Sequence, residues 1–415
     1  MAHFKRNFTL TALNGIFFNF ASAFVSETTV LPTFISNLTD SRFLVGLAGS
    51  LERASWPLPQ VIVAPFAERT ERKKPIYIFT AFVRVFSLLA MALVTFTLGK
   101  YSSSLFLTLF FVVFAIFSLS SGVAGPAFMD IVAKAIPAHR RGSLWAIRIS
   151  VGSGLAVLGG FMVRHLLRTL PFPVNYGTMF LISTGLVSVG LTLFSFVVEP
   201  VQPVTKERKT LREHLVDGRK IFREDANYRG LVRLRLLLGI LFMAAPFYVV
   251  YARETAGFEE SSVGILLAAQ MLGLMLSNIL WGTIANRFGS RLVLIGTSLS
   301  GIVPPLGALA YPLLTPGQWY FPILFMFIGV SGAGLRLGYS TFLLDISPPL
   351  KRLTYIGFIN TMIAPVLFLP TVGGTIVDII SYRPLFAIST VAGILALYTS
   401  TLLREVRRRE IGVKP

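Results

Sequence analysis

Several ionisable side chains lie inside long apolar stretches of the sequence, and three of them stand in the first two stretches. Glu27 stands in the first apolar run, and Glu52 and Arg53 are neighbours in the second. A charge at the centre of a bilayer costs roughly 2.5–3.5 kcal/mol on insertion scales, so residues of this kind usually serve a function. A carboxyl group in apolar surroundings binds a proton more readily than one in water. We therefore predict that Glu27 or Glu52 binds and releases a proton; the alternative is a structural ion pair of Glu52 with Arg84 or Arg148.

Glu52 also belongs to a polar helix face. Glu52, Trp56 and Gln60 follow i, i+4, i+8 spacing, which places them on one side of a helix. An offset of 218 residues carries Glu52 to Gln270 and Gln60 to Asn278, so both halves of the chain repeat the pattern. We expect these side chains to line a polar cavity.

Two further residues extend this predicted cavity. Asn19 lies within about 80° of Glu27, at ~100° per residue, so both can face the same wall. Arg336 lies inside a late apolar run. A charged residue at that depth usually serves a function.

Residues for metal, nucleophilic or nucleotide chemistry are scarce. The sequence has no cysteine, which removes thiolate nucleophiles and thiolate metal ligands. Its four histidines lie far apart, at His3, His139, His165 and His214. There is no G-x-x-x-x-G-K-[ST] loop, so ATP-driven pumping is not expected. The sequence therefore predicts a protein that is not an enzyme, without catalytic residues, metal site or cofactor.

The composition fits a membrane better than water. Hydrophobic residues make up 54% and charged residues 14% of the chain, with a mean hydropathy of +0.71, against roughly 45–50% and about 25% in soluble domains. The net charge of +19 would suggest nucleic acid as the partner of a soluble protein. In a membrane protein, basic loops instead meet anionic lipid headgroups. The expected partner is the lipid bilayer and not nucleic acid.

Twelve apolar runs are long enough to cross a bilayer, for which about 20 residues suffice. They lie near 8–36, 42–67, 76–98, 104–133, 144–168, 177–199, 230–252, 261–286, 291–312, 319–345, 353–379 and 385–403. Most lysines and arginines fall in the segments that share one side with both termini. Because positive charge marks the cytoplasmic side, we predict a multi-pass protein of the plasma (inner) membrane with both termini in the cytoplasm.

A long polar stretch divides the runs into two sets of six. We predict an N-terminal six-helix bundle over 1–199, a cytoplasmic central loop over 200–229 and a C-terminal six-helix bundle over 230–415. Leu215 and Phe222 fall near one face of the loop, which predicts a basic amphipathic helix on the membrane surface. A plain solvated linker is the alternative.

Two cytoplasmic loops repeat one pattern. Segment 64–74 reads APFAERTERKK, and segment 282–291 reads GTIANRFGSR. Their offset of 218 residues is about half of the chain. A repeat at half length indicates two duplicated bundles.

The repeated loops resemble the signature of the major facilitator superfamily (MFS), approximately G-x-L-A-D-R-x-G-R-K between helices 2 and 3. The second copy matches more closely; the first has Ala64, Glu68 and Glu71 where the signature has Gly, Asp and Gly. The resemblance covers the whole chain. It implies an all-α membrane protein of 12 transmembrane helices in two pseudo-symmetric six-helix bundles, around a central cavity formed chiefly by helices 1, 4, 7 and 10. In the family, helices 2 and 8 flank this cavity, which fits the polar faces of Glu52 and Gln270. The resemblance also implies that Arg336, on helix 10, could bind an anionic group of a solute.

The same resemblance implies a cytoplasmic gate made of charged residues at inner helix ends. In the family, such pairs hold the gate closed in the outward-facing state. The expected members in this sequence are Glu68, Arg69, Arg72 and Asp130 in the first half, and Asn286, Arg287 and Asp345 in the second. The alternative is ordinary interfacial charge.

The resemblance implies a monomer that moves a small organic molecule by secondary active transport with alternating access. Gly159-Gly160 in helix 5 and Gly373-Gly374 in helix 11 are similar to family antiporters, so we expect proton-coupled export. Helix 4 lacks the arginine that family drug exporters often carry, which departs from their standard mechanism. The alternatives are an uncoupled facilitator or importer of an anionic solute, and a lipid-handling or sensor protein on the same fold.

Overall fold

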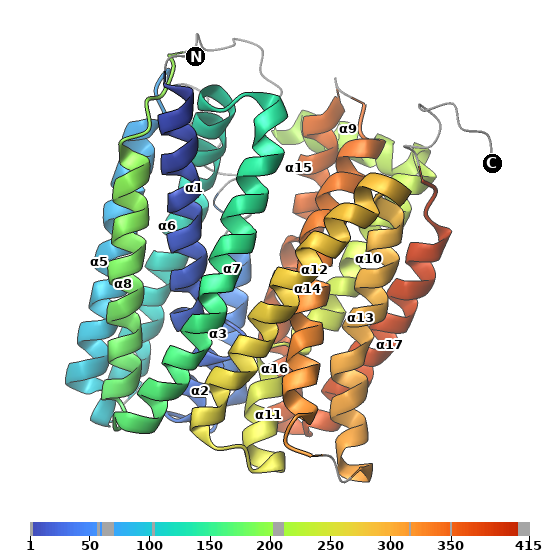
Figure 1. Cartoon of the computed structure of the whole chain (residues 1–415). Coiled ribbons are helices and arrows are strands. Elements are labelled where there is room, and N and C mark those ends of the chain that lie inside the picture. Colours follow the sequence, from blue (N-terminus) through green and yellow to red (C-terminus); the bar gives the residue numbers. More distant parts are fainter. Residues whose placement is uncertain are drawn as a thin grey trace. The chain divides into compact units, whose positions relative to one another are not determined.

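The computed structural model describes residues 3–55, 59, 70–101, 104–201, 211–314, 317–348 and 351–405. Within these ranges all regular secondary structure is helical (Figure 1), which confirms the predicted fold class. Eleven helices of the described residues are long and apolar enough to cross a membrane, and each coincides with a predicted run. The remaining predicted run, near 42–67, begins as α3, Arg42–Ser55, and its second half falls outside the described ranges.

Internal contacts divide the chain into two units. Unit 1 comprises Met1–Lys206 and Val249–Ala268, and unit 2 comprises Glu207–Tyr248 and Ala269–Pro415. The boundary near 206 falls inside the predicted central loop. The units differ from the predicted bundles in the segment 249–268, which groups with unit 1 because its residues contact helices of that unit.

Unit 1 is built around the first helix of the chain. Its helices are α1 Phe4–Ala21, the 3-10 turn η1 Ser22–Val25, α2 Val30–Ser36, α3, α5 Lys74–Leu98, α6 Ser104–Ala135, α7 Ala138–Thr169 and α8 Val174–Ser195. α1 packs against α7 and α8, and α5 packs against α6 and α8. From the second half of the sequence, unit 1 takes most of α11 Phe247–Ala256, the turn η4 Glu260–Ser262 and the start of α12 Val263–Phe288.

Unit 2 repeats this pattern with helices of the second half. They are α9 Leu211–Glu224, α10 Ala226–Leu241, η3 Phe242–Ala244, the rest of α12, α13 Ser290–Ala310, α14 Tyr320–Ile346, α15 Arg352–Ile363, η7 Ala364–Phe368, α16 Leu369–Ile379 and α17 Tyr382–Leu402. α13 packs against α14 and α17, and α10 packs against α17. The helix boundary between α12 and α13 falls at Gly289, whose φ of 96° only glycine adopts without strain.

The first span of each half is broken near its middle. α1 gives way to η1 and then to a turn over Ser26–Thr29 before α2 begins. In the second half, α10 gives way to η3 and a turn that ends at Pro246 before α11 begins. The 218-residue offset carries Glu27 to Ala245, so both breaks occupy the same place in the repeat.

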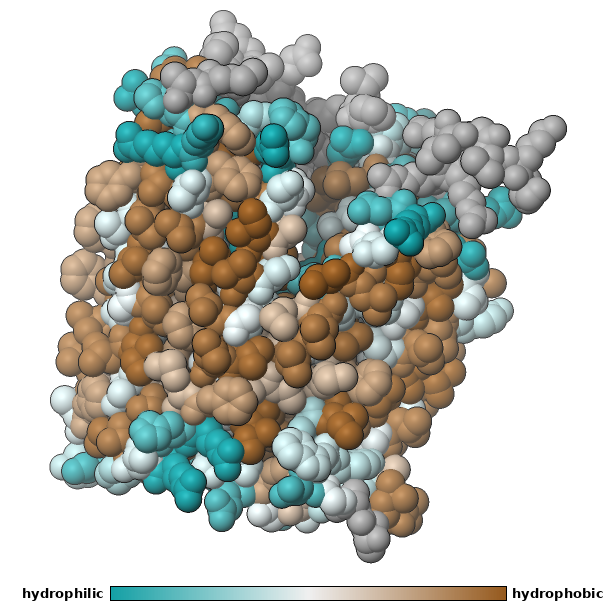
Figure 2. Space-filling view, in the orientation of Figure 1, coloured by the Kyte–Doolittle hydropathy of each residue, from teal (hydrophilic) through white to brown (hydrophobic). Residues whose placement is uncertain are grey.

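Apolar side chains cover the flanks of the helices. On α5, Phe79, Phe82 and Phe86 are 60–69% exposed at spacings of three and four residues, which places them on one helix face. Figure 2 shows a largely hydrophobic surface between hydrophilic ends in each unit. Such exposure suits contact with lipid chains rather than water.

The central stretch contains the helix α9, which packs against α15 and α10. Ile221 is buried in the core of unit 2, Phe222 packs on that core, and Gly218 lies against the ring of Phe358. Asp225 caps the next helix by accepting hydrogen bonds from the backbone amides of Asn227 and Tyr228. The apolar face of α9 therefore covers unit 2.

Candidate functional site

Glu27 lies in the turn that interrupts the first span, and not within a helix. The turn is closed by the amide of Leu31, which donates to the Ser26 carbonyl at 3.0 Å. The hydroxyls of Ser26 and Thr28 are 3.2 Å apart. Unwound backbone at mid-span leaves polar groups free to face a solute or an ion, as at the binding sites of many transporters.

Arg53 of α3 is the ion-pair partner of Glu27. Its Nε donates to Glu27 Oε2 at 3.4 Å, and the two side chains are 20% and 31% exposed. Glu52, one residue earlier on α3, lies near enough to interact electrostatically with both. The structure thus brings three of the sequence-predicted residues into one cluster within unit 1.

A cavity of about 160 Å³ lies beside this cluster, lined only by residues of unit 1. Its walls come from α1, η1, α3, α5, α6 and α8, and Glu52 and Arg84 are its charged residues. Ser118 and Ser121 of α6 add hydroxyl groups, and the remaining lining is mostly apolar. Burial of Arg84, 5% exposed, makes it part of the interior and not a snorkelling residue.

Asn19 and Arg148 join α1 to α7. The side-chain amide of Asn19 donates to the carbonyl of Gly15 at 2.7 Å and to that of Arg148 on α7 at 3.4 Å. Arg148 donates to the Thr11 carbonyl and to Asn14 Oδ1. The alternative of a Glu52 pair with Arg148 is therefore not seen, and Arg148 is an interior residue rather than an interfacial one.

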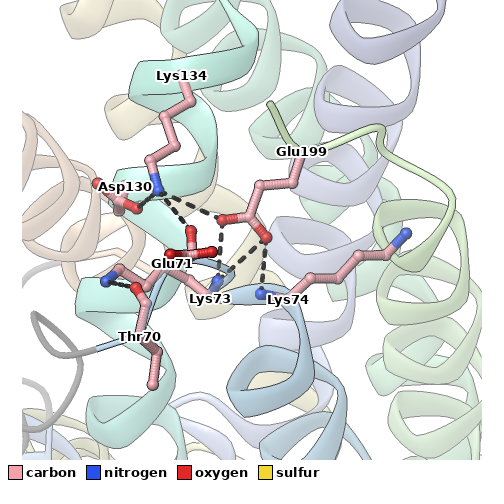
Figure 3. A network of polar contacts seen from close by, with 7 residues as sticks. All are labelled: Thr70, Glu71, Lys73, Lys74, Asp130, Lys134 and Glu199. Carbon is pink, nitrogen blue, oxygen red and sulfur yellow. Dashed lines mark hydrogen bonds and ion pairs between the residues drawn. The ribbon is translucent and has the colours of Figure 1, made fainter. Parts of the chain in front are cut away.

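Glu199, which the sequence analysis did not single out, binds the N-terminus of α5 (Figure 3). Glu199 accepts hydrogen bonds from the backbone amides of Lys73 and Lys74 at 2.9–3.1 Å. Lys134 bridges Glu199 at 3.5 Å and Asp130 at 2.6 Å. A carboxylate at a helix N-terminus satisfies amides that have no partner within the helix. Asp130 thus pairs within α6, whereas the predicted gate residue Arg72 is exposed.

Unit 2 has a counterpart at the start of α13. Glu405 Oε2 accepts a hydrogen bond from the amide of Arg291 at 2.9 Å. Asp345, in the last turn of α14, accepts from the Ser290 hydroxyl at 3.0 Å. Asn286 and Arg287 are exposed in the last turn of α12. In both halves an acid that follows the last span therefore caps the helix after the signature loop.

The remaining predicted residues fall into two groups. In unit 2, Gln270 is buried on α12, Asn278 is half-buried on the same helix, and Arg336 is exposed on α14. Four predicted residues lie outside the described part of the chain: Trp56, Gln60, Glu68 and Arg69. Their roles stay predictions.

A second polar cluster at the opposite end of unit 1 escaped sequence analysis. Glu260 of η4 accepts from Asn37 Nδ2 at 2.7 Å and from the Tyr176 hydroxyl at 2.6 Å. Arg253 donates to Asn37 Oδ1 at 2.9 Å. Arg42 and Glu254 form an ion pair nearby. These contacts join residues more than 80 positions apart, so no local spacing could have indicated them.

Gly159 and Gly160, the predicted helix 5 glycines, lie on α7 and allow close packing in unit 1. A Cβ atom on Gly160 would lie 2.7 Å from the Gly264 carbonyl, and one on Gly159 would lie 2.9 Å from the Cβ atom of Ala23. Both glycines therefore let α7 approach its neighbours. This role explains the Gly-Gly pair without reference to transport direction.

Sequence comparison relates parts of the chain to known proteins. Residues 236–415 match the family model of the Major Facilitator Superfamily. An uncharacterised protein of Mycobacterium tuberculosis is 28% identical over 201 residues, which are 48% of this chain and 38% of that protein. The quinolone resistance protein NorA of Staphylococcus aureus is 26% identical over 179 residues, 42% of this chain and 43% of NorA. The matches span less than half of the length of these curated relatives.

Solved structures extend the likeness to the whole chain. The nucleoside transporter NupG matches with a TM-score of 0.67 at 13% identity, over 97% of this chain and 99% of that chain. A D-xylose-proton symporter matches with a TM-score of 0.70 at 15% identity, over 97% and 98%. At these identities the likeness shows the fold. The second half of the chain thus resembles the Major Facilitator Superfamily in sequence, and the entire chain shares its fold with solved membrane transporters.

Proposed function

We propose that the chain is a secondary active transporter that exports a small organic solute across the plasma membrane in exchange for protons. It works by alternating access as a monomer, with both termini in the cytoplasm. The observation that carries the coupling is the ion pair between Glu27 and Arg53 at the break of the first span.

A proton competes with Arg53 for Glu27. Both side chains keep partial exposure, so protons can reach the pair. Protonation removes the charge of Glu27 and with it the attraction to Arg53, whose unpaired charge then favours another arrangement. The turn over Ser26–Thr29 lies outside regular helix and can rearrange without breaking a continuous ladder of hydrogen bonds. In this proposal, proton binding therefore changes the conformation of the first span.

Glu52 is the second candidate for proton binding. It lines the cavity of unit 1 and is close to Glu27 and Arg53. Gln270, Asn278 and Arg336 of unit 2 stay proposed solute-binding residues.

The proposed direction, export, rests on the similarity of this chain to NorA. NorA is named for quinolone resistance. A membrane transporter that makes a cell resistant to a compound must lower the concentration of that compound inside. The similarity of this chain to NorA therefore supports outward movement of an organic solute.

The proposed cytoplasmic gate combines the predicted residues with the helix caps. The proposed members of the gate are Glu68, Arg69, Arg72 and Asp130 in the first half, and Asn286, Arg287 and Asp345 in the second. Asp130 is the member drawn in Figure 3, where it pairs with Lys134. Glu199 and Glu405 hold the helices that follow each loop.

The test is flux in proteoliposomes that carry a pH gradient. A mixed panel of small organic molecules, including a quinolone, is loaded, and native protein is compared with Glu27→Gln. We expect native efflux to follow the gradient and Glu27→Gln to keep only downhill flux. Glu254→Gln, which changes an acid of the other polar cluster in unit 1, is the matched control and should behave as native. Equal response of native and Glu27→Gln to the gradient would refute coupling at Glu27.

A further inference from the structure

The cavity in unit 1 is small and largely apolar. Its apolar walls include Phe18, Val25, Phe117 and Val187, and its volume is about 160 Å³. An apolar cavity of about 150 Å³ is large enough to bind benzene. The space therefore fits a molecule with one ring or a short branched chain, and excludes lipid chains and fused ring systems.

Arg84 places a buried charge on the wall of this cavity. Its Nε donates to the Thr80 carbonyl at 3.3 Å, and its guanidinium lies 5.5 Å from the centroid of the Tyr77 ring. Nη2 is buried without a hydrogen-bond partner. In the part of the chain that the structure describes, no carboxylate lies within ion-pair distance of Arg84. A buried cation of this kind is costly unless an anion compensates it.

A second unused hydrogen-bonding group faces the same space. Ser118 is buried, with 2% of its surface exposed, and its hydroxyl makes no hydrogen bond. The other cavity serines bond within the bundle: Ser121 donates to the Phe117 carbonyl at 3.2 Å, and Ser183 donates to the Ala21 carbonyl at 3.2 Å. Arg84 and Ser118 thus leave two donors for one ligand group.

We propose that this cavity binds a small organic monocarboxylate with an apolar body, of the size of benzoate. The carboxylate accepts hydrogen bonds from Arg84 and Ser118, and the apolar part packs on the surrounding aromatic and aliphatic side chains. The two carboxylate oxygens accept hydrogen bonds from Arg84 and Ser118, and the negative charge of the ligand compensates the positive charge of Arg84. The site goes beyond the proposed export function, because binding here neither requires nor excludes proton-coupled flux.

Glu52 on the same wall limits the ligand to one acid group. A second carboxylate on the ligand would meet like charge in a confined apolar space, which disfavours dianions. An amide in place of the carboxylate would leave the charge of Arg84 uncompensated. The cavity therefore distinguishes ligands by charge as well as by size.

The test is binding to the purified full chain in detergent, measured by isothermal titration without any gradient. The probes are benzoate, benzamide, terephthalate and 2-naphthoate. We expect benzoate to bind at least about tenfold more tightly than benzamide, which corresponds to about 1.4 kcal/mol. Terephthalate and 2-naphthoate should bind at least about tenfold more weakly than benzoate. Arg84→Gln should bring benzoate and benzamide to the same affinity, and the exposed control Arg168→Gln should keep the difference.

Two further variants keep the proposal testable if Arg84→Gln does not fold. Ser118→Ala should weaken benzoate binding several-fold without changing benzamide, and Val25→Phe should abolish both by filling the cavity. Equal affinity of the native chain for benzoate and benzamide, or no benzoate binding, would overturn the proposal. Competition by chloride as effective as that by benzoate would also overturn it, because a simple halide has no apolar body.

Discussion

The first and fifth spans of each half meet at a glycine, but the two halves place different residues against it. In unit 1, Gly15 of α1 lies against Arg148 of α7, whose Nε would be 2.3 Å from an added Cβ. In unit 2, Gly239 of α10 lies against Val366, at 1.9 Å. The 218-residue offset carries Arg148 to Val366. Arg148 and Val366 thus occupy the same repeat position on the fifth span, with a charge in one half and an aliphatic side chain in the other, although the glycines that they contact are not repeat equivalents.

The other interior charges follow this asymmetry. The same offset carries Glu27 to Ala245, Arg53 to Met271 and Arg84 to Ile302, and it carries Glu52 to Gln270. Unit 2 shows that the repeated fold forms without these charges. Unit 2 therefore provides a matched reference for each of these charges of unit 1.

The largest expected effect comes from making unit 1 resemble unit 2 at Arg148. The variant Arg148→Val removes hydrogen bonds to Thr11 and Asn14 and the stacking on Phe128 and Trp145. We expect the free energy of unfolding to fall by about 3 kcal/mol. The reference variant Val366→Ala should cost about 1 kcal/mol, because it removes only part of a small side chain.

Denaturant unfolding in detergent, followed by circular dichroism, measures both variants. If Arg148→Val cost no more than Val366→Ala, the buried guanidinium would contribute nothing to the stability of unit 1, contrary to its hydrogen bonds.

The next effect compares the two helix caps. Glu199 is 3% exposed and accepts two backbone amides as well as the Lys134 ammonium group, whereas Glu405 accepts one backbone amide. Hydrogen bonds to charged groups contribute roughly 1.5–3 kcal/mol. Glu199→Ala should therefore lower the free energy of unfolding by about 2 kcal/mol, and Glu405→Ala by about 1 kcal/mol, in the same unfolding assay. The reverse order would show that burial of the acid does not decide its contribution.

The smallest effect concerns the second polar cluster of unit 1. Glu260 accepts hydrogen bonds from Asn37 and Tyr176, and Glu260→Ala should cost about 1 kcal/mol. The pair of Arg42 with Glu254 is more exposed, with Glu254 at 39%. Pairs of this kind contribute about 0.5 kcal/mol, so Glu254→Ala should be close to neutral in a thermal melt. A larger loss for Glu254→Ala than for Glu260→Ala would contradict this ranking.

Much of the fold was predictable because bilayer thickness fixes the length of apolar runs. Each of the eleven spans in the described residues matches a run that hydropathy alone defines. The half-length repeat was also visible, since GTIANRFGSR preserves a signature that the first loop follows more loosely. These features are local in sequence and need no tertiary information.

The break at Glu27 was not predicted, for an identifiable reason. The turn over Ser26–Thr29 contains neither proline nor glycine, which are the usual signals of a helix end. Hydroxyl side chains compete with the backbone for hydrogen bonds, and the Ser26 and Thr28 hydroxyls lie together here. The run Ser-Glu-Thr-Thr was a weak signal, and the counterpart in the second half, with Pro246, was a stronger one.

The caps and the interior charges depend on distant partners. Glu199 contacts residues 125 positions away, and Arg148 contacts α1 from α7. Helical periodicity reports which side of a helix a residue occupies but not which helix faces it. Glu27 and Arg53 were singled out from the cost of burying charge, whereas their pairing could only come from tertiary structure.

The most direct test of function in unit 1 counts protons exchanged when the purified protein binds a solute found in the flux assay. In weakly buffered detergent with a pH indicator, we predict that the native chain releases protons on binding and that Glu27→Gln releases none. Glu254→Gln should release as many as the native chain. Unchanged proton release from Glu27→Gln would contradict the assignment of coupling to the broken first span.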